Sequence, residues 1–571
     1  MNRFLKRISE VTARPWIALV CVLVLYLFNV ERWHPTAFFG RFQDDSIYFS
    51  SAKVLAKGGG YVIPSFPGTP PQTKYPFLYP WLLSWIWKLN PSFPHNLKQG
   101  VWLTEFFGCW TLAVTFLLLR KLPGIGEWPA LFLVGLCTVH PIFLRLSGSI
   151  MADLPFMALL LTAVLLADSA MRPGAAAHLA MATGAFAALS VGMRTIGIAV
   201  VAGIFLAALW RRAYRQAILL SAVAGVVMAI ESWPTLFHQV AAQSQDGAQG
   251  WQQTWAYYAD YGRFWRFSVP GMWPFLNMVK LNLLLLVSGP GPFVIAPLSG
   301  PTTLLHTLLF SVLTVPIVAG IARRGKGEEW MPIHFVFLTY CAVLLMWPFP
   351  LFDRYFLPFL PLFFAGLWME TPRLFALLRA NLRRGTSFMQ RAIAAGLVAI
   401  LLAISVFAGW NYLVADPHRL QLASTSRARA MEERKQAYEW IREHTGPDIR
   451  IAAYDDVILY LYTGRQGLRP IAFLPTAEFM DDKRILSRDL AHIAEAARHV
   501  GARFWLTSSD DFDNEAYKEL IDARMTQIKA VLPVVFRSRE DTVQVRDASC
   551  LVETQRADCK AVLLVLFPPE P

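Results

Sequence analysis

The chain has few charged residues for its length. Aspartate, glutamate, lysine and arginine make up 16% of its 571 residues, and hydrophobic residues make up 55%. A soluble globular protein usually carries about 25% charged residues, so the composition excludes an ordinary soluble protein and predicts a membrane protein. The net charge of +13 does not indicate nucleic-acid binding, because the basic residues fall in short clusters between apolar runs. Such clusters are typical of cytoplasmic loops under the positive-inside rule.

Cysteine is also scarce, and no spacing among the six cysteines resembles a zinc site. Four of them lie inside apolar runs, where a thiol packs as a small hydrophobic group. Cys550 and Cys559 lie near the C-terminus and would be able to pair if that region is exported. The sequence also lacks internal repeats, low-complexity tracts and a small-residue cleavage site after its first apolar run. We therefore interpret that run as a retained signal anchor.

Apolar runs of about 20 residues, oriented by lysine and arginine bias, predict about eleven membrane spans, with about thirteen as the rival count. Residues 31–97 are then an external loop, in which 45–57 and 76–89 are expected as helices lying on or partly in the membrane surface. The segment 273–298, interrupted by SGPGP, is predicted to be interfacial or re-entrant, since a full span there would leave the basic loop 323–329 outside. The spans are expected at residues 15–30, 98–119, 127–143, 154–170, 174–192, 194–210, 216–235, 302–322, 332–349, 355–371 and 392–414.

The composition changes at residue 416, where charges become frequent and apolar runs shrink to strand length. Such runs occur at 450–454, 503–508 and 530–536, and helical patterns separate them. Strands that alternate with helices predict an α/β domain. We therefore expect two domains, a polytopic α-helical membrane domain over 1–415 and a soluble extracytoplasmic α/β domain over 416–571.

Three aspartates are expected on the extracytoplasmic face. Asp44 and Asp45 open a helix in the first external loop, and Asp153 precedes an apolar span. Each could simply cap a helix, because a carboxylate stabilises the free N–H groups at a helix N-terminus. An ionisable residue at the end of a span is nevertheless a candidate for function, and one carboxylate of the pair would stay available as a general base. His140 is a weaker candidate near Asp153.

Four basic residues are expected on the same face: Lys74, Arg145, Arg194 and Arg354. Each could place its charge at the interface for solvation alone, and Asp353 could pair with Arg354. Arg354 is the most specific, because it lies in a proline-bounded turn and its fork of donors matches phosphate oxygens. Acids and cations on one face suggest that the cations hold the phosphate of a polyisoprenoid sugar donor. A carboxylate would deprotonate the acceptor, and the sugar would pass through an oxocarbenium-like state with inversion.

The motifs around these residues resemble those of the GT-C membrane glycosyltransferases, in the bacterial branch with protein O-mannosyltransferase-like and aminoarabinose-transferase-like enzymes. The run DDSIYFSSAKVLAKGGGY has Asp44 at the position of that family's catalytic aspartate and Asp45 where glutamate is usual. KYPFLYP retains Lys74 of the Lys-Pro-Pro or Tyr-Pro-Pro motif, with Phe77 in place of the second proline. SIMADLPF places Asp153 at the family's second acid, and RYFLP matches its Arg-Tyr-x-x-Pro turn. The resemblance covers roughly residues 1–415.

The resemblance implies a GT-C fold in a bacterial inner membrane, with a cytoplasmic N-terminus. It implies transfer of a sugar from a polyprenyl-phosphate donor to an acceptor, which is a protein, a lipid or a glycan, at the extracytoplasmic face. Some relatives use a divalent metal at such acids, and Asp44 and Asp153 would be its ligands here. By this resemblance Asp44 is the base, and Asp45 and Asp153 are supporting acids or metal ligands. Lys74 and Arg354 bind the donor phosphate, and Arg194 and Arg145 are weaker candidates for the same role.

Two other kinds of function stay open at this point. A transporter or flippase for a lipid-linked saccharide would predict inverted repeats and charged residues at mid-bilayer. A non-catalytic membrane scaffold with an external binding domain would leave the three aspartates with capping duties alone. Because Asp44 and Asp45 are adjacent, the choice of Asp44 as the base rests on its position in the motif.

Overall fold

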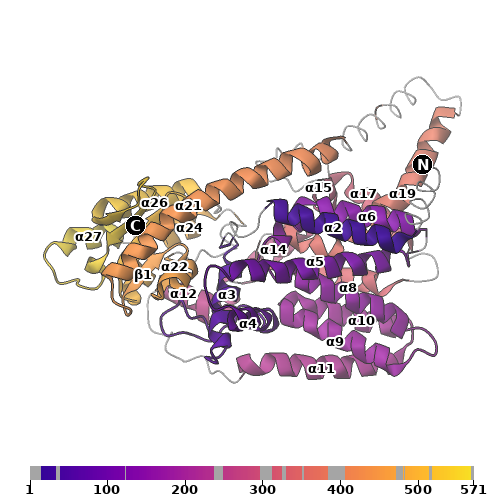
Figure 1. Ribbon diagram of the computed structural model, residues 1–571, viewed down its shortest axis with the longest axis horizontal. Coiled ribbons are helices and arrows are strands. Elements are labelled where there is room, and N and C mark those ends of the chain that lie inside the picture. Colours follow the sequence, from indigo (N-terminus) through magenta and orange to yellow (C-terminus); the bar gives the residue numbers. More distant parts are fainter. Residues whose placement is uncertain are drawn as a thin grey trace, which may run out of the picture.

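A bundle of helices and a smaller domain with a β-sheet make up the chain in the computed structural model (Figure 1). Residues 42–97 and the helix α12 (Gln249–Ala259) lie where the two parts meet, and the helix α13 (Tyr261–Ser268) directly follows α12 in the chain. The structure describes residues 14–33, 39–40, 42–122, 124–236, 249–269, 271–295, 311–324, 330–349, 351, 353–383, 396, 406–470, 480, 482–513 and 517–567.

The helices of the bundle follow the predicted apolar runs. Among the described residues, the helices α2, α5, α8 and α11 are each long and apolar enough to cross a bilayer, and two bent helix pairs would each qualify as one broken span. The total of about eleven spans stays a prediction, because 302–322 and 392–414 lie partly outside the described residues. The bundle helices are α2 (Pro15–Trp33), α5 (Leu97–Leu119), α6 (Glu127–Val139), α7 (Pro141–Ser147), α8 (Asp153–Ala170), α9 (Ala177–Met193), α10 (Ile198–Trp210), α11 (Tyr214–Leu236), α14 (Met272–Ser288), α15 (Pro290–Ile295), α17 (Thr314–Arg324), α18 (Pro332–Leu345) and α19 (Leu360–Arg383).

The span expected at 127–143 is a bent pair of helices, because the helix breaks after Val139. The helices α6 and α7 meet at an angle of 65°. His140 has an extended backbone, with φ −67° and ψ 125°, since the ring of Pro141 disfavours a helical conformation in the residue before it. Pro141 itself is well suited to the first turn of the new helix, where its missing N–H is not needed.

The loop predicted at 31–97 contains two helices close to their predicted ranges, α3 (Asp44–Ala56) and α4 (Leu78–Leu89). The helix α3 differs from the prediction in its surroundings. We expected it to lie on the membrane surface, but its residues Asp45–Ala52 are all buried. It packs against α4 and against the helix α22 (Asp456–Thr463) of the C-terminal domain, so its first residues lie inside the protein.

The C-terminal domain has the expected α/β architecture. Its five-stranded sheet has the order β2-β1-β3-β5-β4, in which β2, β1 and β3 pair in parallel and β5 pairs antiparallel with both β3 and β4. Cys550 and Cys559 form a disulfide. Besides α22, the elements are α21 (Asp416–His444), β1 (Arg450–Ala453), β2 (Gly467–Leu468), α24 (Lys483–Ala491), α25 (Glu495–His499), β3 (Ala502–Ser508), α26 (Lys518–Val531), β4 (Val534–Arg537), β5 (Val543–Asp547) and α27 (Cys559–Leu566).

The core of this domain extends into the segment between α3 and α4. Ile63 and Phe66 pack in the same buried cluster as Trp505 of β3, and the Phe66 ring stacks on Tyr258 of α12 with centroids 4.4 Å apart. The backbone N–H of Gly467 also donates to the Ser65 carbonyl at 2.8 Å. The loop that carries the candidate acids is therefore held by both parts of the chain.

Candidate functional site

Asp44 lies at the start of α3 and binds an arginine that is 310 residues away in sequence. The Asp44 Oδ2 atom accepts from Arg354 Nη1 at 3.0 Å, and the two side chains are only 15% and 21% exposed. The hydroxyl of Tyr75 donates to the other carboxylate oxygen. Arg354 lies in the short 3₁₀ turn Asp353–Tyr355, which precedes α19. The turn thus delivers a guanidinium group directly to the aspartate.

The surroundings of Asp44 keep its carboxylate ionised. Burial raises the pKa of Asp44, but the positive charges of Arg354 and Lys74 and the hydrogen bond from Tyr75 outweigh burial and hold the pKa below its usual value. Cations near a carboxylate favour its charged form, whereas desolvation disfavours it. Asp44 is therefore an anion that is neutralised by bound cations.

Asp45 has a different environment. Its side chain is fully buried, and its two oxygens accept from the backbone N–H groups of Gly40 and Ser46, each at 2.8 Å. Burial raises the pKa of Asp45 to about 7, although these two hydrogen bonds lower it and the charge of Asp44 raises it further. Both oxygens of Asp45 are thus engaged by the backbone, which is the bonding pattern of a structural residue.

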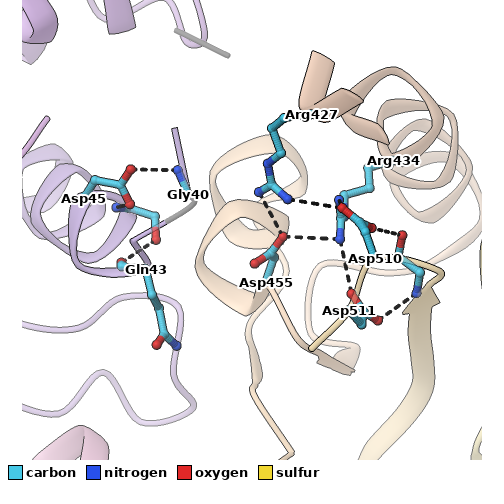
Figure 2. Close-up of polar contacts among 10 residues, drawn as sticks. Gly40, Gln43, Asp45, Arg427, Arg434, Asp455, Asp510 and Asp511 are labelled. Atoms are coloured by element: carbon cyan, nitrogen blue, oxygen red, sulfur yellow. Dashed lines mark hydrogen bonds and ion pairs between the residues drawn. The ribbon is translucent and has the colours of Figure 1, made fainter. Parts of the chain in front are cut away.

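Figure 2 shows Asp45 and Gly40 facing a charged cluster of the C-terminal domain. In that cluster Arg434, which is 2% exposed, donates to Asp510 at 2.8 Å. Buried arginine and carboxylate groups stabilise a structure only when each has a partner, and here the charges are matched across several elements. The ion pairs of the cluster join Arg427 and Arg434 of α21 to Asp455, Asp510 and Asp511.

A second ion pair lies beside the first. Arg194 donates to an oxygen of Asp153, which is 4% exposed and opens α8. Arg194 is in reach because its backbone is extended, with φ −147°, where α9 ends. Both arginines lie near the Tyr355 ring, with the Arg194 and Arg354 guanidinium carbons each 5.6 Å from its centroid. The structure therefore brings Asp44, Arg354, Asp153 and Arg194 together.

Lys74 lies next to this group in an aromatic cage. Its ammonium group donates to the Tyr257 hydroxyl at 2.7 Å and lies 4.1 Å from the centroid of that ring. Tyr75 and Tyr261 form the other walls, at 5.1 and 5.7 Å. Aromatic faces attract a cation without neutralising it, so Lys74 keeps its charge for an anion.

Tyr75, Tyr257 and Tyr261 were not predicted as site residues. The signal for two of them was the run AYYADYGR, which lies between the expected span 216–235 and the segment 273–298. This run falls in α12 and α13, and its Tyr257 and Tyr261 rings lie against Lys74.

The weaker candidates lie at the margin of the site. Burial raises the pKa of Asp353, and the charge of the nearby Arg145 lowers it. Asp353 is therefore close to Arg145, and the alternative pairing of Asp353 with Arg354 is wrong, because Arg354 binds Asp44. His140 Nε2 contacts the carbonyl of Phe293 at 3.0 Å, and its ring packs on that of Phe293. His140 thus serves the packing of α15.

Within the described residues, no group of three or more histidine, cysteine, aspartate or glutamate side chains is arranged to hold a metal ion. Asp44 and Asp153 each have an arginine as their partner. A divalent metal would have to displace these arginines, so the arrangement as built suits an anion that is bound by several cations.

Comparison with known proteins shows which fold the chain has. No family model matches the chain, and no curated protein matches its sequence. The structure is similar to ArnT from Cupriavidus metallidurans bound to undecaprenyl phosphate, with a TM-score of 0.52 and 13% identity over 92% of this chain and 97% of that chain. It is also similar to the Archaeoglobus fulgidus oligosaccharyltransferase in complex with zinc and sulfate, with a TM-score of 0.50 and 14% identity over 92% of this chain and 73% of that chain. Both proteins have the GT-C fold, and the expected GT-C fold of this chain is confirmed.

Proposed function

We propose that this chain, which has the fold of the GT-C glycosyltransferases, transfers a sugar from a polyprenyl-phosphate donor to an acceptor. The observation that carries the proposal is the Asp44–Arg354 pair at 3.0 Å, with the caged ammonium group of Lys74 beside it. The undecaprenyl phosphate bound to ArnT supports the choice of donor. We further propose that the reaction occurs at the extracytoplasmic face of a bacterial inner membrane.

The donor phosphate would bind to the cations of the site. Arg354 presents a fork of N–H donors that matches phosphate oxygens, and Lys74 adds a point charge. Arg194 lies near the same Tyr355 ring as Arg354 and is the next nearest candidate. Arg145 is the weakest of the four, because it lies next to Asp353.

Phosphate binding would also activate the base. Arg354 and Lys74 lower the pKa of Asp44, and a carboxylate held in this way is a weak base. When the phosphate draws these cations to itself, burial becomes the dominant influence on Asp44 and raises its pKa. The carboxylate would then accept a proton readily only after the donor has bound.

The reaction would proceed in one displacement. Asp44 takes the proton from the acceptor hydroxyl or amine while the acceptor atom bonds to the anomeric carbon of the sugar. The bond between that carbon and the phosphate oxygen breaks, and its electron pair stays on the phosphate, where Lys74 and Arg354 stabilise the charge. Attack from the face opposite the phosphate inverts the anomeric carbon.

The other two acids would support this arrangement. Asp153 binds Arg194 and so holds one wall of the site in place. Asp45 fixes the turn at Gly40 in front of α3, which sets the direction of the neighbouring Asp44 side chain. If the enzyme uses a divalent metal, Asp44 and Asp153 are the carboxylates that would hold it.

The test is transfer in proteoliposomes that contain the purified protein, a panel of undecaprenyl-phosphate sugars and bacterial envelope lipids and proteins as acceptors. We expect one sugar lipid to be consumed, with one undecaprenyl phosphate released for each sugar transferred and with inverted anomeric configuration in the product. Movement of an intact sugar lipid between leaflets, without release of undecaprenyl phosphate, would identify a flippase. Consumption of no panel member by folded protein would refute the proposal.

A further inference from the structure

Gln43, the residue before Asp44, has an unusual backbone conformation. Its φ is +59°, in the left-handed region that few residues other than glycine adopt. Its side chain does not cap α3, although it occupies the capping position. Strained residues persist where surrounding contacts fix them, and they cluster at active sites. The conformation of Gln43 is therefore fixed by contacts other than a helix cap.

The hydrogen bonds of the Gln43 carboxamide assign its two ends. Its Oε1 atom accepts from the Tyr257 hydroxyl at 3.0 Å and from Arg469 Nη1 at 2.8 Å. An ammonium group can only donate hydrogen bonds, so the Tyr257 hydroxyl accepts from Lys74 and uses its own O–H to donate to Gln43. A guanidinium group also only donates. Both contacts thus require an oxygen at this position.

This assignment leaves the NH2 group of Gln43 without an acceptor. The nitrogen is buried, and it has no hydrogen-bond partner among the residues that the structure describes. A buried N–H donor without a partner is rare in native proteins. It lies on a residue that adjoins Asp44 and is two hydrogen bonds from the Lys74 ammonium group.

We propose that the Gln43 NH2 group binds the substrate, donating to a phosphate oxygen of the lipid donor or to a hydroxyl oxygen of its sugar. This inference rests on the proposed function. It makes Arg469 of the C-terminal domain a positioning residue, because its guanidinium group fixes the orientation of the carboxamide.

Arg469 is held by contacts in the region where the helix bundle and the C-terminal domain meet. Its guanidinium carbon lies 4.0 Å from the centroid of the Tyr454 ring, and its backbone N–H donates to the Tyr258 hydroxyl at 3.0 Å. The Tyr258 hydroxyl donates in turn to Asp456 at 3.1 Å. The C-terminal domain thus contributes directly to the architecture of the site.

Two substitutions of Gln43 separate binding from folding. Gln43→Gly removes the carboxamide and suits the positive φ, whereas Gln43→Glu keeps an oxygen for Tyr257 and Arg469 but removes the NH2 group. Gln99→Glu is the matched control, because the Gln99 Oε1 atom accepts from Asn90 away from the site. Each variant is measured for its Tm, its Kd for undecaprenyl phosphate, and its kcat and KM for the panel of sugar lipids.

We expect both Gln43 variants to bind at least about tenfold more weakly, which corresponds to the loss of one hydrogen bond to a charged or polar oxygen. The Tm of Gln43→Glu, which keeps an acceptor for Tyr257 and Arg469, should stay within about 2 °C of the wild type. A raised Kd for undecaprenyl phosphate identifies the phosphate as the partner, and a raised KM for the sugar lipid alone identifies the sugar. Unchanged Kd and KM, or a loss of activity that follows a loss of Tm, would overturn the inference.

The role of Arg469 has its own test in a double-mutant cycle. If Arg469→Leu acts through Gln43, it raises the same constant, and the double variant with Gln43→Gly is no worse than Gln43→Gly alone. Additive losses would refute a positioning role. If the wild type neither binds undecaprenyl phosphate nor transfers sugar, the proposed function itself fails. If the wild type does both and Gln43→Gly equals it, only the inference about Gln43 fails.

Discussion

Asp44→Asn should affect donor binding and catalysis in opposite directions. The substitution preserves the size of the side chain and leaves an oxygen for Tyr75, but it removes the charge that binds Arg354. The variant has no base, so the acceptor keeps its proton. At the same time Arg354 loses the carboxylate that competes with the donor phosphate.

The sizes of the two effects follow from the geometry of the site. An exposed ion pair contributes up to about 1 kcal/mol, and removal of one partner from a fully buried pair costs about 3–5 kcal/mol. The Asp44 and Arg354 side chains are 15% and 21% exposed. The interaction of Asp44 with Arg354, which competes with donor binding, should therefore contribute about 1–2 kcal/mol, near the lower of these values. Donor affinity should therefore rise roughly 5- to 30-fold. Loss of a general base lowers kcat by about 10²- to 10⁴-fold.

The assay compares the Kd for undecaprenyl phosphate in detergent with the kcat for transfer in proteoliposomes. Asp168→Asn is the control, because it also removes a carboxylate from an arginine, Arg211, at 3.2 Å, but at the other end of α8. It should leave the Kd for the donor unchanged. Weaker donor binding by Asp44→Asn, or a kcat equal to that of the wild type, would refute the roles assigned to Asp44 and Arg354.

Three further substitutions test other parts of the account. Lys74→Ala should weaken donor binding about 10- to 100-fold, the value of a hydrogen bond to a charged group, and should leave the acceptor KM unchanged; equal effects on both would exclude its phosphate role. Asp45→Asn should cost about 1–3 kcal/mol of stability, because two backbone N–H groups share one remaining acceptor, and a normal Tm with abolished transfer would make Asp45 the base. Burial raises the pKa of Asp456 to about 7, against about 3.9 in the unfolded chain. The contribution of Asp456 to stability is therefore complete below pH 4 and is lost as the pH rises through 7. Asp456→Asn should flatten the fall in Tm between pH 5 and 8. A variant whose Tm falls with pH in parallel with that of the wild type would contradict this.

The sequence predicted most of the individual side chains of the site but not their pairing. Asp44, Lys74, Asp153 and Arg354 were recognisable because each lies in a short local motif. The contact between Asp44 and Arg354 depends on how α3 and the turn before α19 meet in space, and no local pattern encodes that meeting. For the same reason the sequence left Asp353 open as a partner of Arg354.

The helices were predictable where hydrophobic length alone decides, as in α5 and α8. The break between α6 and α7 was not predicted, because the apolar run continues through it and only the effect of Pro141 on the residue before it ends the helix. Gln43 carries no motif at all. Its importance follows from a positive φ and an unpartnered NH2 group, which depend on Tyr257 and on Arg469, a residue 426 positions away.

The most direct test of the central claim is a structure of the protein with undecaprenyl phosphate bound. We predict a phosphate within hydrogen-bond distance of Lys74 and Arg354, and an Asp44 carboxylate that no longer binds Arg354. A phosphate bound elsewhere, with the Asp44–Arg354 pair intact at about its present 3.0 Å, would contradict the account.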